Sequence, residues 1–196
     1  MIDNNPFYES DIFRINEGTN GKVFYQADAK LDLYNTLPIC GVPSKWIVHD
    51  ESEIVEEDYG DFKYQYINGT DDVFLKGLSD SAEFKSSELV LPYDANVIAR
   101  SAFNKSFVGQ NKILNSITSI YMPEESQIER IQIAAFAENT SITSVNLDGN
   151  KLVHVGIASF RDCSKLTQIT LSNKVKDIGP WCFLNCSNLT QVNLHE

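Results

Sequence analysis

Residues 165–187 read KLTQITLSNKVKDIGPWCFLNCS, and the two segments before them share the same pattern. Residues 141–164 read SITSVNLDGNKLVHVGIASFRDCS, and residues 116–140 read SITSIYMPEESQIERIQIAAFAENT. A further unit begins at Asn188 and stops after its first strand, while a looser copy begins near Leu89. Self-similarity at a period of 23–25 residues indicates a repeat architecture.

Aligning the units places equivalent residues in shared columns. In a solenoid each coil buries its apolar side chains only against the equivalent side chains of its neighbours, so such columns are required. We therefore predict a mainly β solenoid of about four coils of 23–25 residues with one short strand each. Its core ladder consists of a phenylalanine column followed by a small, polar column: Phe103, Phe136, Phe160 and Phe183, then Asn139, Cys163 and Cys186.

The repeat pattern L-T-x-I-x-L-x-x-x-V-x-x-I-G-x-x-x-F-x-x-C-S resembles the BspA-like leucine-rich repeat of bacterial and protozoan surface proteins. Residues 165–187 match it almost position for position, residues 116–164 match with short insertions, and residues 87–115 match only in part. The resemblance implies a curved leucine-rich-repeat solenoid with a role in adhesion or recognition. It implies no catalytic residues, and none are assigned.

Period-2 alternation in each repeat strand sends the residues between the apolar positions outward. These residues form a continuous polar face in a stacked sheet, which is the usual binding face of a solenoid. An alternative interpretation is that these residues are only soluble positions on a structural spacer. The candidate binding face comprises Ser119, Tyr121, Ser144, Asn146, Asp148, Gln168, Thr170, Ser172, Gln191, Asn193 and His195.

Residues 1–86 contain no repeat and carry a net charge of −10, whereas residues 87–196 carry −1. Strand-like patterns occur at 22–34 and 44–50, and residues 61–69 with 72–78 read as a hairpin with an Asn-Gly turn signal. The acidic run 50–61 reads as a solvated loop or as a charged sheet edge. We predict a small β-rich N-terminal domain, residues 1–86, that caps the repeats of residues 87–196 and attaches the protein.

Several classes of function are disfavoured by the sequence. A net charge of −11 opposes nucleic-acid binding, and no apolar run is long enough to span a membrane. The acidic run lacks the ligand spacing of a calcium loop, and the cysteines and histidines lack zinc spacing, so we expect no metal and no cofactor. No G-x-S-x-G elbow is present, and we expect no enzymatic activity.

Two interpretations of function remain open. The first is a recognition or adhesion module on a cell surface, which binds a protein or a glycan and belongs to a homo-oligomer or larger assembly. The second is a structural virion component, such as a phage fibre, decoration or tail-associated protein. Both place the protein outside the cell, although residues 1–6 do not resemble a signal peptide. The last coil ends without a cap, which favours assembly, chain continuation or a tolerated open edge.

Overall fold

The computed structural model describes residues 12–14, 22–26, 46–50, 54–67, 71–106 and 111–194. The chain divides into two units, residues 1–55 with 67–69 and residues 56–66 with 70–196. Among the described residues, the first unit contains an antiparallel sheet in which β2 (Lys22–Gln26) pairs with both β1 (Ile12–Arg14) and β3 (Trp46–Asp50). β2 and β3 fall within the two strands predicted at 22–34 and 44–50, and residues 27–34 lie outside the described residues.

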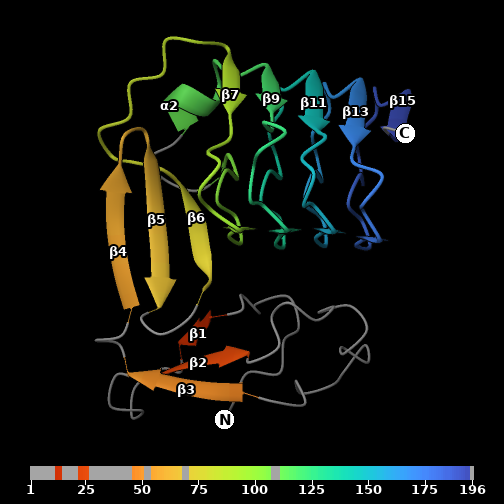
Figure 1. Ribbon diagram of the computed structural model, residues 1–196. Helices are drawn as coiled ribbons and strands as arrows, with labels where there is room; N and C mark the ends of the chain where they lie inside the picture. Colours follow the sequence, from red (N-terminus) through yellow and green to blue (C-terminus); the bar gives the residue numbers. More distant parts are fainter. Residues whose placement is uncertain are drawn as a thin grey trace. The chain divides into compact units, whose positions relative to one another are not determined.

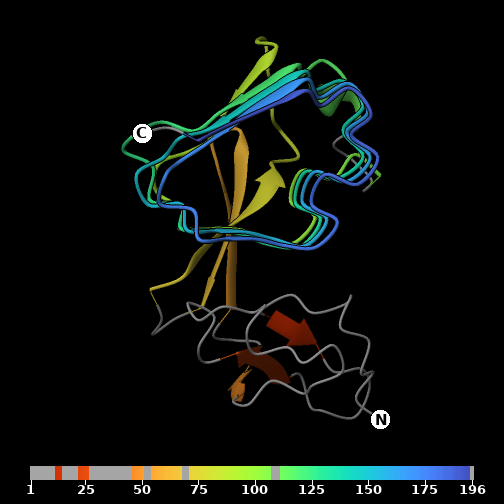
Figure 2. The same ribbon diagram turned by 90° about the vertical axis from the view of Figure 1, so that its right-hand side faces the viewer.

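The second unit is a solenoid whose coils stack along one axis (Figure 1), and an end-on view superimposes the coils (Figure 2). The first strand of every coil joins a parallel sheet, as predicted. These strands are β7 (Glu88–Val90), β9 (Ser119–Tyr121), β11 (Ser144–Leu147), β13 (Gln168–Leu171) and β15 (Gln191–Leu194). The leucine-rich-repeat solenoid is therefore confirmed, and its strands belong to five successive coils.

A second sheet lies across the core, built from a further strand of two residues in each of the first four coils. These strands are β8 (Val97–Ile98), β10 (Arg130–Ile131), β12 (His154–Val155) and β14 (Asp177–Ile178). They pair in parallel and were not expected, because the sequence predicted one strand per coil. A short helix, α2 (Asn111–Leu114), occupies the insertion before β9.

The second sheet continues past the first coil into strands from the N-terminal part of the chain. β6 (Val73–Leu78) pairs in parallel with β8 and antiparallel with β5 (Phe62–Ile67), which confirms the predicted hairpin. β4 (Ile54–Tyr59) forms the edge of the sheet and carries the part of the acidic run that contains Glu56, Glu57 and Asp58, so this part is a charged edge strand. Strands on both sides of residue 86 thus share one sheet, and a domain boundary at that residue stays a prediction.

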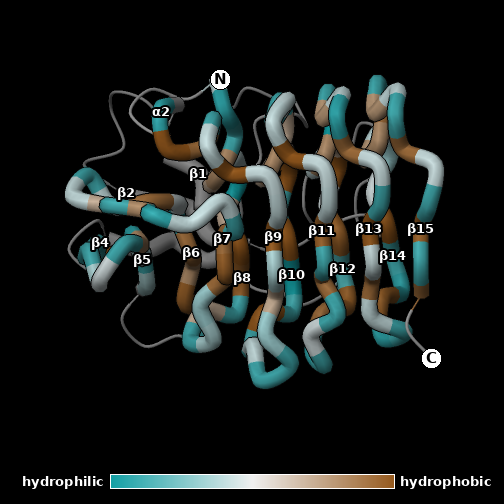
Figure 3. The backbone as a smooth tube through the Cα atoms, turned by 90° about the horizontal axis from the view of Figure 1, so that it is seen from above, coloured by the Kyte–Doolittle hydropathy of each residue, from teal (hydrophilic) through white to brown (hydrophobic). Residues whose placement is uncertain are grey.

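The core consists of apolar columns that run along the solenoid, visible as repeated brown bands at equivalent points of successive coils (Figure 3). Phe103, Phe136 and Phe160 are fully buried, and consecutive ring centroids lie 5.2 Å apart with interplanar angles of 5° and 7°. Phe183 extends the stack at 6.0 Å and is only half-buried. Offset stacking of aromatic rings adds a favourable contribution beyond that of buried area.

The turn around each stacked phenylalanine requires left-handed backbone. The residue two positions before the ring has a φ of 54° at Ser101, 55° at Ala134, 53° at Ala158 and 58° at Trp181. The residue two positions after the ring repeats this geometry at Glu138, Asp162 and Asn185. Left-handed backbone costs an L-residue about 1–2 kcal/mol, so the packing of neighbouring coils must hold these turns.

A buried ion pair connects the second coil to the chain before the repeats. Arg130 Nη2 lies 2.9 Å from Asp72 Oδ1, and each side chain is 7% exposed. Asn96 also approaches this carboxylate and accepts a hydrogen bond from the Val73 N–H at 2.8 Å. Burial raises the pKa of Asp72, and Arg130 opposes that rise. The pair therefore couples β10 to the residue just before β6.

Candidate binding face

The outward side of the five-stranded sheet carries two rows of side chains that run across all five strands. Register places the residues of each row directly beside one another on neighbouring strands. One row contains Glu88, Ser119, Ser144, Gln168 and Gln191, and the other contains Val90, Tyr121, Asn146, Thr170 and Asn193. We refer to these two rows as the strand face.

The alternate positions of the same strands point into the core, which fixes the strand face as the outward one. Leu89, Ile120, Val145 and Ile169 are at most 2% exposed, and they form one inward column. Each pairs in register with the next, so a shift of one residue would exchange core and surface along the whole sheet.

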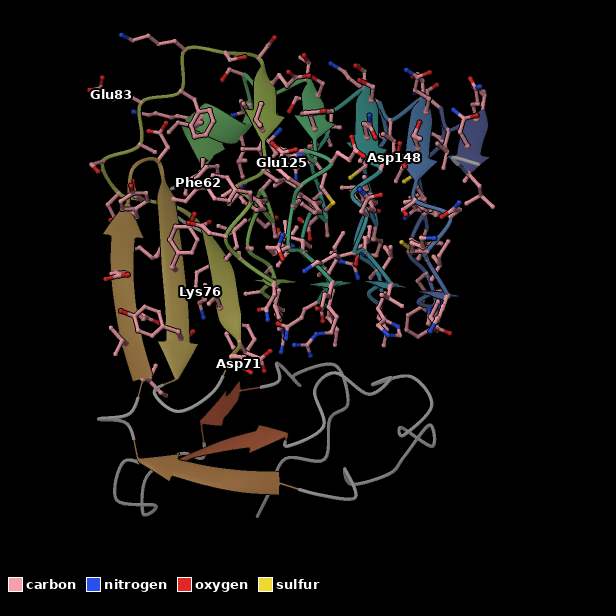
Figure 4. All side chains as sticks on the ribbon, in the orientation of Figure 1. Phe62, Asp71, Lys76, Glu83, Glu125 and Asp148 are labelled. Carbon is pink, nitrogen blue, oxygen red and sulfur yellow. The ribbon has the colours of Figure 1, made fainter. Side chains whose placement is uncertain are left out.

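Most of the predicted face residues lie on the strand face. Tyr121, Gln168 and Gln191 are exposed, and the remaining ones are half-exposed, namely Ser119, Ser144, Asn146, Thr170 and Asn193. His195 lies outside the described residues. Asp148 follows the end of β11 and is half-exposed (Figure 4), and its backbone N–H donates to Asn146 Oδ1 at 3.0 Å.

Ser172 differs from the expectation that it points outward, because it is 4% exposed. The alternation was extended one residue beyond β13, which ends at Leu171, and the chain turns there. The Ser172 hydroxyl accepts a hydrogen bond from the Lys174 N–H at 3.2 Å, so it closes this turn. Ser172 is therefore a turn residue and is unavailable on the strand face.

The first two coils give the strand face an apolar end that the sequence analysis missed. Val90 is 43% exposed and pairs in register with Tyr121, which is 38% exposed. Residues 89–94 of the looser copy, LVLPYD, align with residues 120–125, IYMPEE, and that alignment would have placed Val90 in the Tyr121 column. Beyond Tyr121, the same row continues with the polar residues Asn146, Thr170 and Asn193.

Hydrogen bonds between coils hold the backbone that presents this face. The hydroxyls of Thr143 and Thr167 donate to the carbonyls of Thr118 and Thr143, at 3.1 and 2.8 Å, just before each strand begins. Thr190 continues the series by donating to the Thr167 carbonyl at 3.3 Å. Each of these coils is thus joined to the preceding one by a side-chain hydrogen bond next to the strand face.

The predicted small polar column makes a second series of bonds between coils. Asn139 Nδ2 donates to the Phe103 carbonyl at 2.7 Å, Cys163 Sγ to the Phe136 carbonyl at 3.3 Å, and Cys186 Sγ to the Phe160 carbonyl at 3.0 Å. Burial raises the pKa of the nearby Cys182 thiol to about 12. Cys186 is only half-buried, and a side-chain hydrogen bond between Cys186 and Cys163 lowers the pKa of the Cys186 thiol.

Within the described parts of the chain, no group of three His, Cys, Asp or Glu side chains is arranged to hold a metal ion. No helix there is long and apolar enough to cross a membrane. Within the described residues, the strand face presents two regular rows of accessible side chains, one residue of each row on every strand of the sheet.

Comparison with solved structures finds bacterial leucine-rich repeat proteins that are similar in fold. A leucine-rich repeat protein from Bacteroides capillosus ATCC 29799 is 20% identical in sequence. The two structures match with a TM-score of 0.58 over 72% of this chain and 99% of that one, so they share the fold. The T. pallidum leucine-rich repeat protein is 19% identical, with a TM-score of 0.48 over 70% and 71% of the two chains. A leucine rich cell surface protein from Faecalibacterium prausnitzii A2-165 is 17% identical, with a TM-score of 0.45 over 75% and 41%.

Among curated proteins, none matches the sequence. The BspA type leucine rich repeat region, however, matches residues 98–196 in six copies, which is half of the chain. This range contains the strands of the later coils and the whole phenylalanine stack, and it begins within β8 of the first coil. The chain belongs to the BspA-type leucine-rich repeat family.

Proposed function

We propose that the protein is a non-enzymatic recognition or adhesion protein of an outer surface, which binds a macromolecular partner through the strand face. Residues 1–86 attach it to a larger assembly in this proposal. The observation that carries it is the pairing of Val90 with Tyr121 at one end of an otherwise polar array.

The composition of the strand face favours a protein partner over a glycan. Tyrosine is enriched among residues that contribute most to protein–protein binding, and such anchors are surrounded by polar groups that exclude water. Val90 and Tyr121 supply an apolar anchor at one end of the strand face, and Ser119 and Asn146 lie beside Tyr121 with partial exposure. The neighbouring Glu88 is exposed and gives this end a negative charge.

A structural role in a particle is the second candidate. It is favoured by the later coils, whose outward residues are all polar and include the small, half-exposed residues Thr170 and Asn193. Such residues supply little contact area, as expected of a spacer. In that case the repeats would act as a scaffold in a phage fibre, decoration or tail-associated protein, and the strand face would have no ligand.

Matched tyrosine variants test the binding proposal. Labelled protein comprising residues 1–196 is applied to an array of extracellular proteins and glycans, together with the variants Tyr121→Ala and Tyr93→Ala. Tyr93 is also an exposed tyrosine, but it lies beyond the end of β7. We expect Tyr121→Ala to weaken the strongest interaction by roughly 30-fold, the effect of a residue central to an interface, and Tyr93→Ala to leave it unchanged. Equal binding by both variants would refute a role for the strand face.

A further inference from the structure

A groove lies on the side of the solenoid, where each coil passes from the five-stranded sheet to the second sheet. It has a volume of about 590 Å³ and is formed by three successive coils. Its lining comprises Glu129, Asn150, Lys151, Val153 and residues 173–176. We call it the lysine groove, because three of these residues are lysines, Lys151, Lys174 and Lys176.

The lining side chains are arranged in two rows that run from coil to coil. The Val153 N–H donates to the Glu129 carbonyl at 2.9 Å, and the Lys176 N–H donates to the Val153 carbonyl at 2.8 Å, so these three residues form one row. Lys151 and Lys174 form the other row, since each lies three residues before the start of one of the paired strands β12 and β14. Hydrogen-bonded neighbouring strands lie about 4.8 Å apart, and this distance spaces the side chains within each row.

Both rows point sideways from the solenoid and not along its stacking axis. Lys151 is exposed although it has a coil on either side, with Gln127 in the preceding coil and Lys174 in the next. Its Nζ donates a hydrogen bond to Gln127 Oε1, and Gln127 is exposed as well. Val153 is likewise half-exposed between coils. The stacking of one coil on another therefore leaves these positions accessible.

The lysine groove is positively charged in a chain whose net charge is −11. Within the described residues, the ammonium groups of Lys174 and Lys176 are exposed and have no carboxylate partner, whereas Arg130 and Arg161 both lie in ion pairs. The lining contains one carboxylate, that of Glu129, which is half-exposed in the row of Lys176. Three positive charges against one negative charge make this groove a site for an anionic ligand.

We propose that the lysine groove binds an acidic polysaccharide that carries one carboxylate on each sugar residue. Lys151 and Lys174 each hold one carboxylate, because their spacing of about 4.8 Å is close to the length of one sugar residue in an extended chain. An ammonium has three donors, so Lys151 keeps two after its bond to Gln127. The exposed Asn173 amide can both donate to and accept from the sugar hydroxyls.

The lining favours a polysaccharide over a protein partner. The centres of protein interfaces are enriched in aromatic residues and depleted of lysine, whereas this lining has three lysines and no aromatic residue. Its apolar part consists of Val153 and Val175, and both are only half-exposed. The N–H groups of Val153 and Lys176 already bond to the preceding coil, so they are not free to pair with an added peptide strand. The proposal does not rest on the role of the strand face.

Binding of the protein comprising residues 1–196 to immobilised polygalacturonate, followed by biolayer interferometry, tests the proposal. We expect binding at low salt that is lost near 1 M salt, where the Debye length falls to about 3 Å. Lys174→Gln should weaken binding by about three- to fivefold, and adding Lys176→Gln by about tenfold in total. Lys165→Gln is the matched control, because it removes an exposed lysine outside the groove, and it should leave the affinity unchanged.

A variant of opposite sign and two other polymers complete the experiment. Glu129→Gln should strengthen binding to polygalacturonate by about twofold, since it removes the negative charge of the lining. Neutral dextran should not bind, and Tyr121→Ala should bind polygalacturonate as the wild type does, which separates this site from the strand face. No binding to polygalacturonate at low salt, or an equal loss in Lys165→Gln and Lys174→Gln, would overturn the proposal. Tighter binding to polyglutamate than to polygalacturonate would also overturn it, by assigning the groove to an acidic protein segment.

Discussion

Substitution of Gly156 by alanine tests how closely neighbouring coils approach. A Cβ atom at this position would lie 2.6 Å from the carbonyl carbon of Gln132 and 2.6 Å from the carbonyl oxygen of Ile131. Both atoms belong to the backbone of the preceding coil, which has no side-chain freedom to move aside. Ordinary carbon–carbon contacts are about 3.5–4.0 Å, so the coils would have to separate by roughly 1 Å.

The expected cost is about 1–3 kcal/mol in the free energy of unfolding, as for other overpacked sites. Separation is resisted by bonds between the same coils, such as that from the Val153 N–H to the Glu129 carbonyl at 2.9 Å. Gly156 does not have a positive φ, so its backbone conformation is open to alanine. Without the clash, alanine would stabilise the fold by about 0.4–1 kcal/mol, because it lowers the conformational entropy of the unfolded chain. The sign of the change therefore reports the contact.

Urea unfolding followed by circular dichroism measures this difference. Gly149→Ala is the matched control, because its Cβ would meet the flexible Met122 side chain, whereas the backbone carbonyl oxygen of Pro123 is 3.6 Å away. We expect Gly156→Ala to lower the free energy of unfolding clearly more than Gly149→Ala. A Gly156→Ala protein as stable as the wild type would refute the close packing of coils described above.

Three further expectations concern single sites. Ala134→Gly should raise the free energy of unfolding by about 0.5–1 kcal/mol in urea titration, because it relieves the left-handed backbone at that residue. Iodoacetamide should modify Cys186 before Cys182 in a peptide mass-spectrometry time course, since the pKa of Cys186 is lowered and that of Cys182 is raised to about 12. Arg130→Met should cost about 3–5 kcal/mol at neutral pH by leaving Asp72 without its buried partner. Burial raises the pKa of that carboxyl, and in the variant Arg130 no longer opposes this rise, so that only the hydrogen bond from Asn96 still lowers the pKa. The carboxyl therefore holds its proton more strongly in the folded variant, and thermal melts should show the deficit growing as the pH rises.

The solenoid could be predicted from the sequence because its information is repeated. Each inward position, such as Val145 or Ile169, occurs in the same place in several units, so an alignment of the chain with itself gives both the coil length and the strand register. The phenylalanine stack follows from the same alignment. Ser172 was misplaced because alternation applies only within a strand, and the sequence does not mark where β13 ends.

Features that depend on distant residues could not be predicted. The strands β10, β12 and β14 are only two residues long and begin with the polar residues Arg130, His154 and Asp177, so no alternating apolar pattern marks them in the sequence. They form because the coils on either side align their backbones. The buried pair of Arg130 with Asp72 joins positions 58 residues apart, one within the repeats and the other before them. Nothing local to either residue indicates the other.

The threonine bonds and backbone bonds that join successive coils have a mechanical consequence. These hydrogen bonds run along the stacking axis. Tension applied between the two ends of the solenoid would therefore break the bonds of one coil before those of the next. Each released coil of 23–25 residues would lengthen the chain by roughly 80 Å when fully extended. Under load the repeats would therefore act as an extensible tether that yields in uniform steps.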